Sequence, residues 1–161
     1  MSSKAQAALA VFKSYEGEEE GVGDWLTVDQ DRINTFADAT LDHQFIHIDP
    51  IKSAELSPYK VTIAHGFLTL SLMVHLGGSI APLKPEALEG VYMGVNYGLD
   101  KVRFPAPVPV DSRIRARHRL VSAELKNAST IQIKREVIIE IDGGAKPVCI
   151  AESLVLMMYS D

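Results

Sequence analysis

Apolar residues with interspersed polar ones dominate the second half of the chain. They form four strand-like runs, at residues 91–104, 112–125, 129–141 and 147–159, and polar and apolar positions alternate most clearly at residues 113–120, so we predict β-strands in these runs. The breaks between the runs, APVPVD, LKNAS and DGGAKP, are rich in turn-forming residues. We therefore expect an antiparallel sheet.

A helical period of apolar positions marks the first half. Residues 25–28 predict a short strand, and Asp29 can then cap a helix that ends near Thr40 and carries Ile33, Phe36 and Ala37 on one face. Asp49 followed by Pro50 predicts a second, short helix through Ala54. Residues 15–24, YEGEEEGVGD, have no periodicity, and we expect a loop whose glutamates are solvated.

The longest apolar segment is IAHGFLTLSLMVHLGG, at residues 63–78. It is apolar nearly all round, which predicts a central buried helix that ends at Gly77. Its histidines and glycines argue against a membrane span. One long helix followed by antiparallel strands predicts a single α+β domain over residues 1–161, in which the sheet wraps the helix.

Composition narrows the class of protein. Of 161 residues, 47% are apolar and 23% charged, as in ordinary globular domains, and a net charge of −5 argues against nucleic acid as a partner. The only cysteine, Cys149, cannot form an internal disulfide, and the N-terminus has no evident export signal. We expect a reducing, cytoplasmic location.

The strand at residues 112–125 has an unusually basic face. Arg113, Arg115, Arg117 and Arg119 alternate with residues that face the core. The simplest interpretation is a solvated face balanced by nearby acids, and the alternative is a grip on the phosphates of a cofactor.

The stretch LDHQFIHIDP, residues 41–50, contains four titratable side chains between apolar ones. Asp42 and His47 lie on a predicted loop, where a carboxylate and an imidazole can together orient and polarise one water molecule. The alternatives are an Asx-turn at Asp42 with a buried, hydrogen-bonded His47, or a metal site formed by His43, His47 and Asp49. We expect no metal, because the helix begins after both histidines.

A second candidate feature is the start of the apolar helix at His65 and Gly66. Free backbone N–H groups at a helix start can stabilise negative charge on a carbonyl oxygen, and glycine lets a substrate approach the backbone. The alternative is a glycine needed only for close packing.

Three patches together resemble one family. FADATLDHQFIHIDPIKSA and IAHGFLTLSL resemble the signature of MaoC-like, (R)-specific enoyl-CoA hydratases, and ATLDHQFIHIDP with NYGLDKVRFPAPVPV resembles its NodN-like branch. The patches span residues 36–110 in matching order. This chain departs from the commoner signature at Gln44 and Phe45, where Asn-Pro is usual, which affects the expected substrate range more than the chemistry.

The resemblance implies a hot-dog fold, usually a homodimer, and reversible addition of water to a trans-2-enoyl thioester of coenzyme A or acyl carrier protein, giving an (R)-3-hydroxyacyl thioester without a metal or redox cofactor. It implies Asp42 and His47 as the catalytic pair and Gly66 as the amide that polarises the thioester carbonyl. His65, Asn96 and Arg103 are further candidates for substrate binding, although core or surface roles remain open for the last two. The alternative functions are a non-catalytic acyl-thioester-binding or signalling protein, and a thioesterase on the same scaffold.

Overall fold

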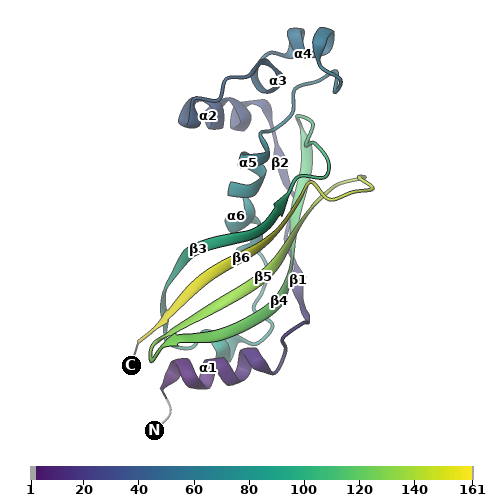
Figure 1. The fold of residues 1–161 in the computed structure, drawn as a ribbon. Coiled ribbons are helices and arrows are strands. Elements are labelled where there is room, and N and C mark those ends of the chain that lie inside the picture. Colours follow the sequence, from purple (N-terminus) through teal and green to yellow (C-terminus); the bar gives the residue numbers. More distant parts are fainter. Residues whose placement is uncertain (1–2, 161) are drawn as a thin grey trace.

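The computed structural model describes residues 3–160, and these are built around one curved antiparallel sheet (Figure 1). The strand order is β1-β4-β5-β6-β3, where β1 is Glu19–Val22, and β2 (Leu26–Val28) also pairs with β4. The four long strands end within two residues of their predicted bounds; they are β3 (Val91–Arg103), β4 (Ser112–Asn127), β5 (Thr130–Ile141) and β6 (Cys149–Tyr159). The prediction of an antiparallel sheet is confirmed.

Helices cover the inner face of this sheet at two places. The apolar segment forms α5 (Gly66–Ser71) and α6 (Met73–Gly77), and Leu68 and Leu76 are buried in one core cluster with residues of β4, β5 and β6. The other end of the sheet is covered by α1 (Lys4–Lys13) and the short 3-10 helix η1 (Pro85–Leu88). The sequence analysis did not predict α1, although Ser3 and Gln6 form a capping box at its start.

The central helix differs from its prediction in two respects. It is divided at Leu72, which keeps a right-handed helical conformation and a hydrogen bond to Leu68, so the two parts continue one another. It is also not buried all round, because Phe67 and Val74 are 69% and 61% exposed. Among the described residues, no helix is long and apolar enough to cross a membrane.

The segment predicted as a loop contains a strand, β1 (Glu19–Val22), paired with β4. Its glutamates are not simply solvated, so that expectation was wrong. Glu20 accepts two hydrogen bonds from Arg135, at 2.6 and 3.1 Å, and the two side chains are only 8% and 16% exposed. The glutamate run therefore anchors an edge strand to the sheet by ion pairs, which a search for apolar periodicity does not detect.

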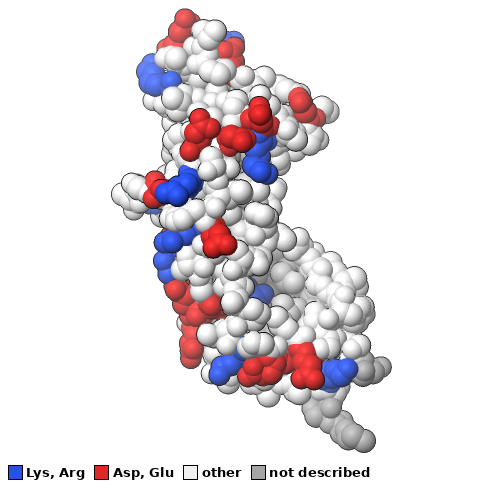
Figure 2. All heavy atoms as spheres, turned by 180° about the vertical axis from the view of Figure 1, so that it is seen from behind, with Lys and Arg blue, Asp and Glu red and all other residues white. Residues whose placement is uncertain are grey.

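The basic face of β4 is neutralised by neighbouring acids. Arg115 and Arg117 both contact Glu140, while Arg119 pairs with Glu136 and Arg113 with Asp142. In the view of Figure 2, basic and acidic side chains lie in mixed groups and form no single basic patch. The interpretation as a balanced outer face is confirmed for these four arginines.

The remaining helices extend beyond one end of the sheet (Figure 1). After β2 (Leu26–Val28), the chain forms α2 (Gln30–Thr40), the single turn α3 (Phe45–Ile48) and α4 (Pro50–Leu56). Asp29 and Asp49 cap α2 and α4 as predicted, each accepting a hydrogen bond from a backbone N–H three residues later. This projecting part holds residues 41–50 above the start of the central helix.

Candidate active site

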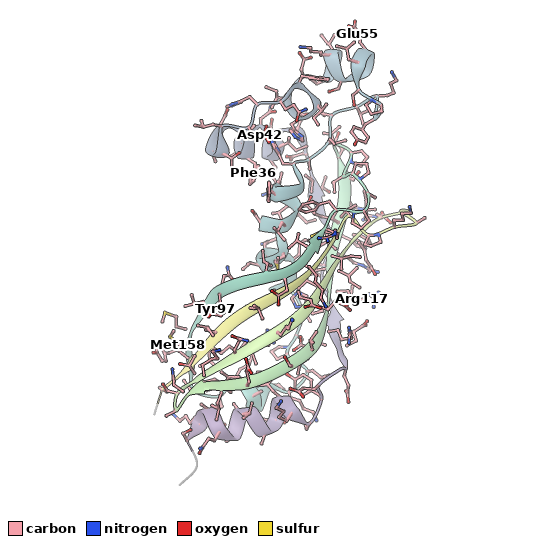
Figure 3. The ribbon with its side chains drawn as sticks, in the orientation of Figure 1. Phe36, Asp42, Glu55, Tyr97, Arg117 and Met158 are labelled. Atoms are coloured by element: carbon pink, nitrogen blue, oxygen red, sulfur yellow. The ribbon has the colours of Figure 1, made fainter. Side chains whose placement is uncertain are left out.

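Asp42 lies in the turn between α2 and α3, on the part of the chain that projects beyond the sheet (Figure 3). The preceding residue, Leu41, ends α2 in a left-handed conformation with φ 63°, which turns the chain back toward the core. The Asp42 side chain is 53% exposed. Its carboxylate is therefore not buried in the core and is accessible to a ligand.

His47 is buried, at 6% exposure, on the single turn α3. Its Nδ1 lies 2.7 Å from the main-chain oxygen of Ile63. Because a carbonyl oxygen can only accept, Nδ1 carries the proton, and in the neutral ring Nε2 presents a lone pair. Burial lowers the pKa of His47 below its usual 6.5, and the nearby His65 lowers it further. The ring is therefore neutral at pH 7, with a basic nitrogen available.

His65 contacts both of these residues. Its ring is 2% exposed and stacks on that of His47, with 3.8 Å between the ring centroids and 23° between the planes. Its Nε2–H donates to the main-chain oxygen of Asp42 at 2.9 Å, and the ring of Phe36 lies 5.0 Å away. One imidazole thus joins the Asp42 turn to His47.

The side chains of Asp42, His47 and His65 converge. One carboxylate oxygen and one ring nitrogen from each histidine all lie within 4.8 Å of one another. When two atoms are both hydrogen-bonded to one water molecule at the tetrahedral angle, they lie about 4.6 Å apart. The observed spacing therefore suits a water held between Asp42 and His47. The Asx-turn contact is also present, but it is long, at 3.4 Å from Gln44 N to Asp42 Oδ1.

The metal site considered from the sequence is not assembled. The ring of His43 instead pairs with Asp38 at 2.8 Å, and Asp49 caps α4. The actual trio of Asp42, His47 and His65 also suits an ion poorly. An imidazole binds metal along a lone pair in its ring plane, at about 2.0–2.1 Å for zinc, and two stacked, nearly parallel rings cannot both point at one ion.

Gly66 begins α5 immediately after His65, and its N–H has no acceptor in the preceding turn of a helix. A methyl group at its Cα position would meet the ring of Phe104 at 3.0–3.1 Å. Both residues line a cavity of about 290 Å³ together with Tyr59, Ile63, Ala64, Thr69, Pro105, Ala106, Pro107, Val108 and Val148. Gly66 therefore allows close packing against Phe104 and also offers a backbone N–H to a ligand.

Asn96 and Arg103 lie on β3, outside the Asp42–His47–His65 group. Asn96 is exposed and lines a groove of about 450 Å³ between the central helix and β3 and β6. Arg103 is exposed at the end of β3, where its Nη1 donates to the main-chain oxygen of Val102. It precedes Phe104, whose ring lies beside Gly66.

The sequence analysis missed the residues that support His47. Gln30 donates from Nε2 to the main-chain oxygen of His47 at 2.7 Å and accepts from the Thr62 hydroxyl. Ser53 donates to the main-chain oxygen of Phe45 at 3.1 Å. No local pattern marks these side chains, because each acts on backbone that is distant along the chain.

Comparisons with known proteins agree on one family. The model of the MaoC-like domain matches residues 11–140. The 3-hydroxyacyl-thioester dehydratase Z of Mycobacterium tuberculosis is 49% identical over 92% of this chain and 94% of its own length. Nodulation protein N of Rhizobium leguminosarum is 43% identical over 96% and 93%. The unliganded R-hydratase PhaJ1 of Pseudomonas aeruginosa superimposes with a TM-score of 0.66 at 20% identity, over 90% of this chain and 83% of that one.

Proposed function

This chain belongs to the MaoC-like domain family, and we propose that it adds water reversibly to a trans-2-enoyl thioester, forming an (R)-3-hydroxyacyl thioester. It is a hydro-lyase of acyl thioesters with a hot-dog fold. The observation that best supports the proposed mechanism is the convergence of the Asp42 carboxylate with a ring nitrogen of His47, whose Nδ1 proton is directed to the Ile63 oxygen.

We assign the proton transfers to His47. Its Nε2 accepts a proton from the water as the water oxygen bonds to the β-carbon, and the electron pair of the double bond moves toward the thioester oxygen. The same nitrogen then returns the proton to the α-carbon. The carboxylate of Asp42 accepts the second hydrogen bond of the water and so fixes the direction of attack. Dehydration follows the same steps in reverse.

Gly66 supplies the complementary group. We assign its N–H the role of donating to the thioester oxygen while negative charge develops there, as in an oxyanion hole. The reaction adds only water to the thioester, so we expect no redox cofactor. We expect no metal because the stacked rings of His47 and His65 suit an ion poorly. The thioester carrier is coenzyme A or acyl carrier protein.

The test is incubation with crotonyl-coenzyme A. We expect the enoyl absorbance to fall without release of free thiol. Asp42→Asn and His47→Gln should each reduce kcat by about 10²–10⁴-fold, the usual contribution of acid–base catalysis. His43→Gln is the matched control, because this neighbouring imidazole is exposed and pairs with Asp38. Release of thiol would indicate a thioesterase, and binding without either change would indicate a non-catalytic acyl-thioester protein.

We also propose that two copies pair along β3. This strand is at the edge of the sheet, and its residues 92–101 are exposed, including Tyr92, Met93, Val95, Tyr97 and Leu99. An edge of this length is a template for pairing with another strand. Light scattering should give the mass of a dimer for the wild type and of a monomer for a Val95→Pro variant. A monomeric wild type would contradict the proposal.

A reducing, cytoplasmic location is the simplest for this enzyme. Cys149 is buried and unpaired, and burial raises the pKa of its thiol to about 11. A buried thiol of this kind needs no oxidising environment.

A further inference from the structure

We propose that His65 is a positioning residue that holds the Asp42 carboxylate opposite His47, an assignment that rests on the proposed hydratase function. His65 does not touch the reacting atoms in this role. It acts through one hydrogen bond to the Asp42 main chain and through its ring contact with His47.

The other restraints on the Asp42 turn lie at the surface. His43 pairs with Asp38 at 2.8 Å, but the two side chains are 45% and 78% exposed. Leu41, which leads into it, is 81% exposed and so contributes almost no burial. Its left-handed φ of 63° is unfavourable for a residue with a branched side chain. The contact from Gln44 N to Asp42 Oδ1 is long, at 3.4 Å. The 2.9 Å bond from buried His65 is therefore the strongest described connection between this turn and the core.

The donor direction of His65 is fixed by the same reasoning as for His47. The main-chain oxygen of Asp42 can only accept, so Nε2 of His65 carries the proton. Its Nδ1 is buried without a hydrogen-bond partner among the described residues. The same Nε2 also lies 4.0 Å from the Asp42 carboxylate, so both contacts of His65 with Asp42 are made from one side of the ring. The imidazole thus serves as a rigid donor of fixed orientation.

The ring of His65 has a separate effect on His47. Stacking at 3.8 Å removes water from one face of the His47 ring. The titratable groups that face His47 among the described residues are His65 and Asp42. Loss of the His65 ring would therefore return water to His47, whereas loss of only the Nε2–H donor would not.

Two substitutions separate these contacts. His65→Phe keeps a flat ring against His47 but removes the donor, so kcat for crotonyl-coenzyme A should fall about 10–100-fold with KM changed less than about 3-fold. His65→Gln keeps an N–H near the position of Nε2 but removes the ring. Its kcat should stay within about 5-fold of the wild-type value. The acid limb of its pH profile of kcat/KM should move to higher pH. The control is His118→Gln, which replaces a buried imidazole in a separate cavity lined by Tyr15 and Gly77, and it should leave both parameters unchanged.

Amide hydrogen exchange of residues 41–46 tests the positioning without an activity assay. Exchange should quicken in His65→Phe and remain near the wild-type rate in His65→Gln. If the wild type hydrates crotonyl-coenzyme A but both variants lose kcat equally with an unmoved acid limb, His65 is only structural and the inference is wrong. If the wild type shows no hydration, the proposed function fails, and unchanged exchange in His65→Phe would then overturn the positioning role independently.

Discussion

Breaking the buried pair of Glu20 and Arg135 by removing one partner should strongly destabilise the protein. Glu20→Leu leaves the Arg135 guanidinium without a carboxylate in a site where it is only 16% exposed. Removing one partner of a buried pair costs about 3–5 kcal/mol. An unfolding entropy of about 2.1 cal/mol/K per residue gives about 0.34 kcal/mol/K for 161 residues. The variant should therefore melt about 9–15 °C below the wild type.

The assay is calorimetry at one protein concentration, with two comparisons. Asp142→Ala breaks the pair of Asp142 with Arg113, whose side chains are 46% and 53% exposed, and should cost no more than about 1 kcal/mol. The double variant Glu20→Leu/Arg135→Met removes both buried charges and should recover at least half of the loss. A Glu20→Leu variant that melts no lower than Asp142→Ala would refute the reasoning.

Three further predictions concern the active site and the core. Because the pKa of His47 is lowered and its neutral form is required, the acid limb of kcat/KM should lie below pH 6.5, as a pH–rate profile would show. Burial lowers the pKa of His118 to about 4, so the unfolded chain binds this proton first as the pH falls below 6.5. The free energy of unfolding should therefore decrease by up to about 3 kcal/mol between pH 6.5 and 4, and His118→Gln should remove that part of the dependence in urea titrations. Gly66→Ala should lower kcat/KM because the new methyl group meets the Phe104 ring at 3.0 Å, and Phe104→Leu should restore part of it; equal activity of Gly66→Ala and the wild type would contradict this.

Local sequence patterns were sufficient for most of the fold. Strand-like runs between turn residues placed the four long strands, and in β4 the alternation matches one face toward the core and one toward solvent. Side-chain caps placed the starts of α2 and α4, since Asp29 and Asp49 bond to backbone only three residues away. In these cases the physical cause lies within the segment itself.

The patterns failed where the cause lies elsewhere in the chain. The strand β1 has no apolar alternation; its backbone pairs with β4, and Glu19 and Glu20 form ion pairs with arginines about a hundred residues later. Exposure of Phe67 and Val74 on the central helix could not be read from their apolar character.

The candidate site, too, was predictable where a short motif marks a residue and not where distant parts of the chain meet. Spacing and the family resemblance indicated Asp42, His47 and Gly66, because they occupy two short motifs. The tautomer of His47 depends on the Ile63 carbonyl, and the Asp42 turn depends on His65, which lies 23 positions away. Both contacts arise only when the projecting helices fold back onto the start of the central helix.

The proton on His47 is directed by the peptide group of Ile63. Every amino acid at position 63 would carry the same oxygen, so mutation of that side chain cannot delete the acceptor. The orientation of the base is in this sense encoded by the path of the backbone, and it can persist through sequence drift that alters every neighbouring side chain.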